Sequence, residues 1–339
     1  MAPAPERAEQ LCAPLDACHG RCYGEESERD AWEAPRLVAG CHALARAGYD
    51  SLSADEYRDA DATLAGKVRL LATLLRKARR CIVYSGAGLS TSAGIDDYAS
   101  QAQESVVVKP AQLGGGVRSP LCAQPTVAHR VLVALHKAGL VSRWVNQNHD
   151  GLPQKAGLPQ EAINEVHGAW HAPDNPVVPM SGSLREDLFA DLAALAEEAD
   201  LVLAVGTSLC GMNADRLVTE AAGRAATREQ GHSGCVIVGL QRTVHDADAT
   251  LRIFARCDEA FAMLAADMAL EVPPAWPEGE YFVPRALRGV GEDDYVFRGL
   301  PYDAAGAAAA AGEADTTLEL DLRDGAALVV AGGPHAGAS

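Results

Sequence analysis

Residues 81–100 read CIVYSGAGLSTSAGIDDYAS. The stretch opens with a short apolar run, Cys81–Tyr84, which has the length of a buried strand. Two glycines, Gly86 and Gly88, follow it, and the residues after Leu89 can start a helix. Glycines at such a turn let the backbone approach a pyrophosphate, and a helix N-terminus favours an anion. The motif predicts a dinucleotide-binding turn, although a plain tight turn would leave the same short signal.

Strand-like and helix-like segments alternate on both sides of this turn. Short apolar runs predict strands at 81–84, 143–146, 162–166, 201–205 and 235–238. Apolar residues at three- and four-residue spacing predict helices over 61–80, 125–137, 183–199, 213–227 and 257–269. This alternation predicts an α/β fold, a Rossmann-like open parallel sheet with helices on both faces.

Composition limits the possible classes of protein. The formal net charge of −17 argues against direct nucleic-acid binding and suits basic partners such as lysine-rich tails. No stretch approaches the ~18 uninterrupted apolar residues of a membrane span. The first residues lack a basic region followed by an apolar core, which argues against a secretory signal. Nine cysteines without such a signal indicate reduced thiols, so we expect an intracellular protein, in the nucleus or in the cytoplasm and cytoskeleton.

The chain divides into three segments. Residues 1–60 form an N-terminal extension, 61–270 a core domain and 271–339 a C-terminal extension. The cysteines and histidines of the first segment do not follow a standard zinc spacing, which favours free thiols in a lightly structured extension over a metal site; they are Cys12, Cys18, His19, Cys22, Cys41 and His42. The last segment reads as a Pro-rich strap, an Ala-rich linker at 304–311 and a hairpin of 317–322 with 327–330, turned by Asp324-Gly325.

Four ordered blocks between residues 64 and 270 resemble the signature motifs of the sirtuins, the NAD-dependent protein-lysine deacylases. The family motifs are GAGxSxxxGIPDFR, TQNIDGL, ELHG and a later GTS. In this chain they read GAGLSTSAGIDDY (86–98), NQNHDGL (146–152), EVHG (165–168) and GTSL (206–209), with IVGLQRT at 237–243. Tyr98 and the Leu-Gln-x-Thr ending are most similar to the nuclear and nucleolar subclass.

The resemblance implies a sirtuin-type catalytic domain over 61–270, with a small-domain remnant at about 151–182. It implies that NAD and acylated protein lysines react to give nicotinamide and O-acyl-ADP-ribose. His167 would be the general base, since an imidazole accepts a proton near neutral pH. Asn148 and Asp150 would be catalytic residues at the nicotinamide end. The residues implied for NAD binding are Gly86, Ala87, Gly88, Ser90, Ile95, Asp97, Tyr98, Gln147, Gly206, Thr207, Ser208, Gly239 and Leu240.

The chain departs from the family pattern in the binding site. Ala99 replaces an Arg, and Asp96 adds a negative charge beside it. Loss of a charge-assisted hydrogen bond costs ~1.5–3 kcal/mol, which would weaken NAD binding. Gly239 stands where the family has an Asn on the adenosine ribose. Residues 181–183 replace the Phe-Gly-Glu segment that pairs with the substrate.

The zinc module of the family has no counterpart in the sequence. Sirtuins carry two CxxC pairs after ELHG, whereas residues 169–180 contain no cysteine. We therefore expect no zinc at this site and a reduced small domain. In the family this zinc is structural and lies away from the reaction.

Three functions are compatible with these features. The first is NAD-dependent deacylation, or ADP-ribosyl transfer from the same intermediate. The second is a weak or inactive sirtuin fold that serves as an NAD-binding or structural component of a cytoskeletal or ciliary assembly, joined through its N- and C-terminal extensions. The third, a plain Rossmann dehydrogenase, lacks a recognisable acidic residue for the ribose and a hydride acceptor site. The deacylase is favoured because Gln147, Asn148, Asp150 and His167 are retained.

Overall fold

A computed structural model describes most of the chain from residue 10 to residue 274, together with two strands beyond it. The described ranges are 10–24, 26–41, 44, 52–95, 123–170, 172, 174–179, 182–210, 213–227, 231–274, 296–300 and 318–321. Within them, no helix is long and apolar enough to cross a bilayer.

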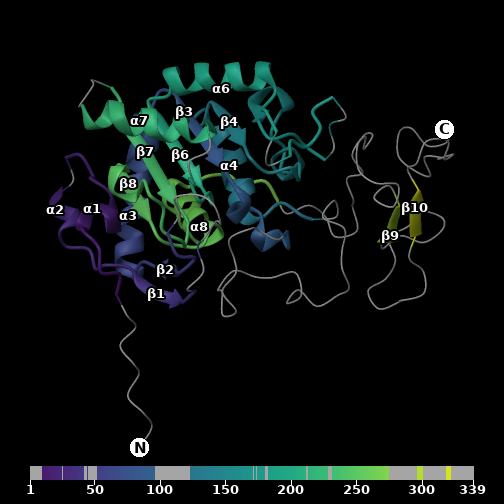
Figure 1. The fold of residues 1–339 in the computed structure, drawn as a ribbon. Coiled ribbons are helices and arrows are strands. Elements are labelled where there is room, and N and C mark those ends of the chain that lie inside the picture. The colour runs from purple at the N-terminus through teal and green to yellow at the C-terminus, as the bar shows by residue number, and fades with distance from the viewer. Residues whose placement is uncertain are drawn as a thin grey trace, which may run out of the picture.

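A six-stranded parallel sheet forms the centre of the molecule (Figure 1). Its strand order is β5-β4-β3-β6-β7-β8, so the chain starts in the middle of the sheet, builds outward to one side and then to the other. The strands are β3 (Cys81–Ser85), β4 (Arg143–Asn146), β5 (Ile163–Glu165), β6 (Leu201–Val205), β7 (Gly234–Val238) and β8 (Leu251–Ile253). This is the strand order of dinucleotide-binding folds, and it confirms the predicted Rossmann-like architecture.

Helices cover both faces of the sheet (Figure 1). One layer contains α3 (Asp61–Lys77), α4 (Val127–Lys137) and α8 (Cys257–Met268), and the other contains α6 (Glu186–Glu198) and α7 (Arg216–Ala226). Alternate residues of each strand face opposite layers: Val83 packs toward the first layer and Tyr84 toward the second. Both strand faces are therefore buried, which explains the continuous apolar runs in the sequence.

Most of the predicted elements are confirmed. All five predicted strands and all five predicted helices are present, with boundaries that shift by a few residues. The three-residue strand β8 and the short helix α5 (Leu152–Lys155) were not predicted. His129 is fully buried and completes a capping box with Thr126 at the start of α4.

The helix expected after Leu89 is absent from the described residues that follow β3. Two 3-10 turns, Ala87–Leu89 and Thr91–Ala93, take its place, and Gly94 ends the second turn in the left-handed region at φ 83°. Two glycines and four small residues give a helix little side chain to pack. The dinucleotide turn therefore offers backbone donors without a helix dipole behind them.

The segment before α3 is more structured than we expected. It contains α1 (Leu15–His19), α2 (Glu26–Arg29) and an antiparallel pair of strands, β1 (Arg36–Ala39) and β2 (Glu56–Arg58). Backbone bonds attach it to the end of the core domain, with Cys22 N–H donating to Thr250 O at 2.8 Å and Tyr57 N–H to Leu240 O at 2.9 Å. The described residues between 10 and 60 therefore lie against the β8 side of the domain, while the proposed division at residue 61 stays a prediction.

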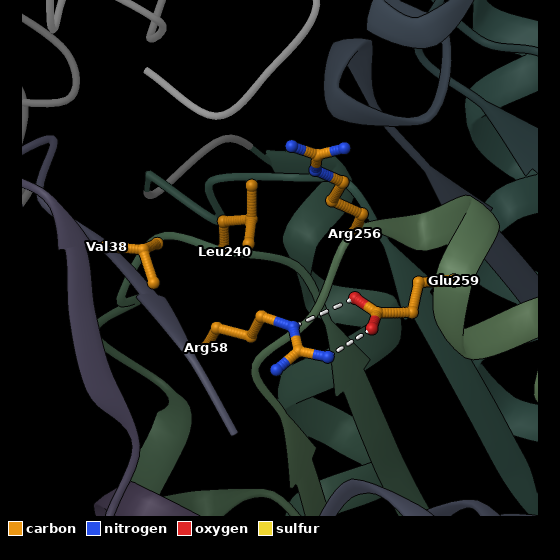
Figure 2. Close-up of a pocket in the computed structure, with 5 residues that line it drawn as sticks. All are labelled: Val38, Arg58, Leu240, Arg256 and Glu259. Carbon is orange, nitrogen blue, oxygen red and sulfur yellow. Dashed lines mark hydrogen bonds and ion pairs between the residues drawn. The ribbon is translucent and has the colours of Figure 1, made fainter. Parts of the chain in front are cut away.

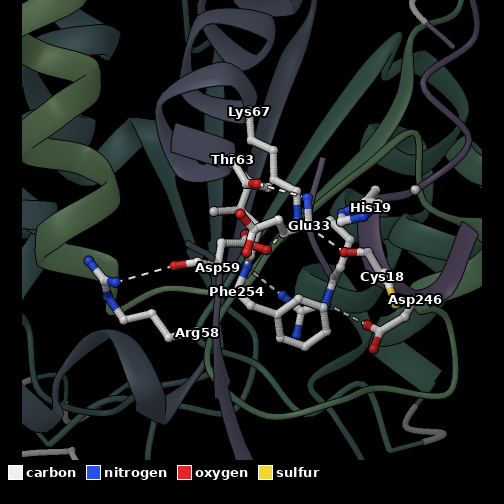
Figure 3. Close-up of polar contacts among 12 residues, drawn as sticks. Cys18, His19, Glu33, Arg58, Asp59, Thr63, Lys67, Asp246 and Phe254 are labelled. Carbon is white, nitrogen blue, oxygen red and sulfur yellow. Dashed lines mark hydrogen bonds and ion pairs between the residues drawn. The ribbon is translucent and has the colours of Figure 1, made fainter. Parts of the chain in front are cut away.

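A buried ion pair holds this segment in place (Figure 3). Lys67 Nζ on α3 lies 2.7 Å from Asp59 Oδ1, and both side chains are 0% exposed. Lys67 also donates to Cys18 O at 3.0 Å, and Asp59 Oδ2 accepts from the Phe254 N–H at 2.8 Å. The pair thus joins four parts of the chain at one point, the N-terminal segment, β2, α3 and the end of β8.

The C-terminal pairing differs from the predicted hairpin. The strand expected at 317–322 is present as β10 (Leu318–Asp321), but its partner is β9 (Val296–Leu300). Residues 327–330, the expected partner, lie outside the described residues. The local Asp-Gly turn signal was therefore misleading for the pairing of β10.

Candidate dinucleotide site at the carboxyl edge of the sheet

The implied site residues follow the carboxyl ends of five neighbouring strands. Ligands of open α/β sheets bind at this edge, in the crevice where the strand order reverses. Here the reversal lies between β3 and β6, which pair in parallel from Cys81 with Leu201 to Ser85 with Val205. The sheet therefore brings together segments that are more than a hundred residues apart in the chain.

The turns after β3 and β6 pack backbone against backbone. Gly88 N–H donates to Gly206 O at 2.8 Å. A Cβ at Gly206, whose φ is +59°, would lie 2.3 Å from Leu89 N, and one at Gly86 would lie 2.9 Å from Gly206 O. The glycines thus serve the contact between the two turns, a role that the sequence motif alone did not reveal.

Three predicted site residues form one hydrogen-bonded cluster. Asn148 Nδ2 donates to Gly86 O at 3.0 Å and to Ser90 Oγ at 3.1 Å. Ser90 Oγ in turn donates to Asp150 Oδ2 at 2.6 Å. All three side chains are buried, with Asp150 4% exposed and Asn148 9% exposed. The loop after β4 is therefore fixed to the loop after β3 through Ser90.

The carboxyl group of Asp150 is in an unusual environment for an acid. Burial raises its pKa, while hydrogen bonds from Ser90 and from the Leu152 N–H act in the opposite direction. Perturbed acids in a crevice are typical of functional sites, although structural networks also produce them. Asp150 can act as a hydrogen-bond acceptor or, when protonated, as a donor.

The β6 turn supplies backbone donors and a link to β4. Gln147 Nε2 donates to Thr207 Oγ1 at 2.9 Å, across the strand ends. Within the described residues, the backbone N–H groups of Ala87, Thr207 and Ser208 donate no hydrogen bond. Buried or half-buried N–H groups need an acceptor, and phosphate oxygens are suitable ones. The turns after β3 and β6 therefore fit the pyrophosphate of a dinucleotide.

His167 lies on the next loop, directly after β5. Its side chain is half-buried, and its carbonyl oxygen accepts from Val178 N–H at 2.9 Å. This loop is joined to the β4 loop by His149, whose Nδ1–H donates to Gly168 O at 2.8 Å. A Cβ at Gly168, with φ +84°, would lie 2.2 Å from Pro176 O, so the turn after His167 requires glycine.

A cavity of about 250 Å³ lies beside the loop that follows β7 (Figure 2). Its lining includes Leu240 from the core, Val38 and Arg58 from the N-terminal strands, and Arg256 and Glu259 at the start of α8. Arg58 Nε donates to Glu259 Oε2 at 3.2 Å, and this pairing raises the pKa of Arg58. Arg256 forms no ion pair within the described residues, so its positive charge is available to a ligand.

The remaining implied residues are only partly placed. Ile95 is half-buried after Gly94, and Gly239 donates its N–H to Ile253 O at 3.2 Å. Asp97 and Tyr98 lie outside the described residues, as does Ala99. The sequence analysis gave no role to Ser85, Trp144 and Asn146, whose buried polar side chains hydrogen-bond to one another between β3 and β4. Their polar atoms at the ends of apolar runs were the available signal.

No group of three or more His, Cys, Asp and Glu side chains in the described part of the chain is arranged to hold a metal ion. The expectation of a zinc-free small domain stays a prediction. Between β5 and α6, the described residues contain only turns and irregular backbone.

Comparison with known proteins finds similar sequences and a similar fold among the sirtuins. No protein-family model matches the chain. The human NAD-dependent protein deacetylase sirtuin-7 is 28% identical over 296 residues, which cover 73% of this chain and 71% of that protein. The NAD-dependent protein deacetylase SRT1 of Arabidopsis thaliana is 28% identical over 256 residues, 65% of this chain and 53% of that protein.

Solved structures agree on the fold. A Sir2 mutant bound to a p53 peptide and NAD aligns with a TM-score of 0.50 and 22% identity, over 60% of this chain and 98% of that chain. The chain thus has an α/β fold similar to that of Sir2 proteins, with motif residues gathered at its carboxyl edge. In sequence it is similar to NAD-dependent protein deacetylases of the sirtuin family.

Proposed function

We propose that this chain is an NAD-dependent protein-lysine deacylase that acts inside the cell, in the nucleus or the cytoplasm. The observation that carries the proposal is the cluster of Asn148, Ser90 and Asp150 at the strand-order reversal. The relatives that match over most of the chain are named NAD-dependent protein deacetylases. NAD, when bound, supplies the ADP-ribosyl group that receives the acyl group.

The residues of the crevice suit the two ends of the dinucleotide. The free N–H groups of the β3 and β6 turns would hold the pyrophosphate, and Leu240 and Arg256 would lie at the adenosine end. Arg256 supplies a cation at this edge of the sheet, whereas Ala99 supplies none. Asn148 and Asp150 would hold the nicotinamide end, where their burial excludes water.

The reaction also needs a proton acceptor, and His167 is the residue proposed for it. An imidazole near neutral pH can take a proton from a hydroxyl group during attack. The hydrogen bond from His149 to Gly168 O holds the His167 loop against the Asn148 loop. The two loops are therefore held together, which keeps His167 at a fixed position relative to Asn148.

The test is nicotinamide release from NAD with a pool of acyl-lysine peptides. We expect His167→Ala to lower turnover by about 10²–10⁴-fold, the usual contribution of a general base. The matched control is His136→Ala, because His136 is also half-buried but lies at the opposite end of the sheet, where its ring bonds the Val141 carbonyl. Its turnover should equal that of the wild type.

Three outcomes would change the proposal. Unchanged turnover in His167→Ala would remove His167 as the base. Release without peptide would indicate NAD hydrolysis or ADP-ribosyl transfer. No release from the wild type would contradict the enzyme, and calorimetry with NAD would then separate a binding protein from a scaffold in a larger assembly.

A further inference from the structure

We propose that Trp144, Ser85 and Asn146 form a positioning relay, which sets how Asn148 presents its side chain to a ligand. The inference rests on the proposed function of the Asn148 loop. None of the three relay residues belongs to the implied catalytic or cofactor-binding set.

The relay is a continuous chain of buried hydrogen bonds between β3 and β4. Trp144 Nε1–H donates to Ser85 Oγ at 2.7 Å, and Ser85 Oγ–H donates to Asn146 Oδ1 at 2.8 Å. All three side chains are 0% exposed. The indole is itself fixed by stacking on the His129 ring at a centroid distance of 6.2 Å. Ser85 Oγ thus accepts from Trp144 and gives its only hydrogen to Asn146, so both bonds of this hydroxyl lie within the relay.

The end of the relay holds both backbone polar groups of Asn148. Asn146 Oδ1 accepts from Asn148 N–H at 3.2 Å, and Asn146 Nδ2 donates to Asn148 O at 3.3 Å. A carboxamide can do this because it carries an acceptor and a donor in one plane. The hydrogen that Ser85 donates keeps Oδ1 of Asn146 on the Ser85 side. The orientation of the Asn148 peptide therefore depends on Ser85 of β3, acting through Asn146.

With its backbone held by the relay, the Asn148 side chain makes two further hydrogen bonds, and these decide which of its atoms is left for a ligand. Both hydrogens of its Nδ2 are used, one by Gly86 O and one by Ser90 Oγ. The side-chain atom that Asn148 can still offer is Oδ1, which accepts hydrogen bonds from a hydroxyl or an amide N–H. Ser90 can receive the Asn148 donor because its own hydrogen goes to Asp150. Asn148 is thus left with an acceptor atom, and it is joined to Asp150 through Ser90.

A purely structural role would also require buried polar groups to be paired, so the experiment needs a control for lost stability. Tyr84→Phe provides it. Tyr84 precedes Ser85 on β3, is equally buried, and donates to Asp215 Oδ1 at 2.8 Å on the opposite face of the sheet. Like Trp144→Phe, this variant removes one buried donor from an aromatic ring, but it does not touch the Asn148 loop.

The experiment measures hydrogen exchange of residues 147–152 in the full chain without ligand, together with nicotinamide release and the melting temperature. We expect Trp144→Phe and Asn146→Ala to exchange about tenfold faster in this segment than the wild type. We also expect their kcat to fall about tenfold or more, with the KM for peptide unchanged. Tyr84→Phe should melt at a lower temperature than the wild type, while the exchange of residues 147–152 and the kcat stay at wild-type values.

The proposal is overturned if Trp144→Phe leaves exchange of 147–152 unchanged, or if Tyr84→Phe raises it equally. The exchange measurement decides on the relay even when the wild type releases no nicotinamide. In that case the proposed deacylase activity fails, while faster exchange in both relay variants still supports the positioning role. The two failures are therefore distinguishable.

Discussion

Asp150 is a carboxylic acid placed inside the site at a cost to the folded chain. Burial raises its pKa above the value in the unfolded chain, so folding favours the protonated form. Its contribution to stability is therefore greatest below the unfolded pKa, near ~4, and is lost as the pH rises through the folded pKa. At neutral pH the buried acid therefore makes the fold less stable than a neutral group of the same shape would.

We predict that Asp150→Asn raises the free energy of unfolding at pH 7 by about 1 kcal/mol, or about 2–4 °C in melting temperature. The amide keeps an oxygen for the Leu152 N–H, which lies 2.9 Å from Asp150 Oδ1. The difference from the wild type should shrink as the pH falls toward 4, as measured by thermal denaturation. Glu197→Gln, an exposed change on α6, is the control and should show no shift. A lower melting temperature at pH 7 would contradict the argument.

The sequence indicated a role for residues that belong to a known motif. It did not indicate a role for residues whose function depends on a side chain from an adjacent strand. Gln147, Asn148 and Asp150 were identified from the sequence. Asn146 looked like a simple departure from the family motif, because its role depends on Ser85 of the adjacent strand. That pairing follows from the register of β3 with β4, which places Ser85 beside Asn146 and which no local pattern shows.

At the scale of elements, the two glycine turns at the carboxyl edge act as one unit. Gly86 and Gly88 of the first turn contact Gly206 of the second at distances that leave no room for a Cβ. The first turn therefore has its position set by the second. Any ligand that bonds to both turns binds a surface that is already assembled.

We predict that Gly206→Ala destabilises the domain by about 1–3 kcal/mol and lowers NAD affinity. Its φ of +59° is unfavourable for Ala, and the new Cβ would lie 2.3 Å from Leu89 N. The control is Gly223→Ala within α7, where a Cβ meets nothing within 4 Å. That change should stabilise the domain by about 0.5–1 kcal/mol. Denaturant unfolding and NAD titration would measure both, and equal effects of the two variants would refute the turn-packing role.

Elements with strong periodicity were predicted, and those held by distant partners were not. The amphipathic pattern of α3 and the apolar run of β6 were each sufficient to predict the element from the local sequence. By contrast, β8 and β2 have three residues each, too few for a pattern, and form because long-range partners pair with them. The partner of β10 was misassigned for the same reason, since β9 lies outside its local sequence.

At the scale of the whole molecule, the Lys67–Asp59 pair is the main polar connection between the N-terminal segment and the core (Figure 3). Burial raises the pKa of Asp59 and lowers that of Lys67, and each partner opposes the shift of the other. Removing one partner therefore leaves an uncompensated charge in a site from which water is excluded. The N-terminal segment depends on both.

We predict that Lys67→Met lowers the free energy of unfolding by about 3–5 kcal/mol. The double variant with Asp59→Asn should recover most of this loss, because the amide is neutral and keeps an oxygen for the Phe254 N–H. Glu33→Gln, which breaks the exposed pair with Arg36, should cost less than about 1 kcal/mol. Urea unfolding of the four proteins tests this, and a double variant no more stable than Lys67→Met would contradict it.

Because the N-terminal segment packs against β8, it is synthesised long before the residues that it contacts. Arg21 contacts Ala247, 226 residues later, and Asp59 contacts Phe254, 195 residues later. At a translation rate of about 5–20 residues per second, the segment waits roughly 10–40 s on the ribosome for these partners. During that time Leu11 and Cys18, which end up packed around Phe254, stay uncovered and accessible to chaperones. The part of the domain that is synthesised first is therefore among the last parts to be packed.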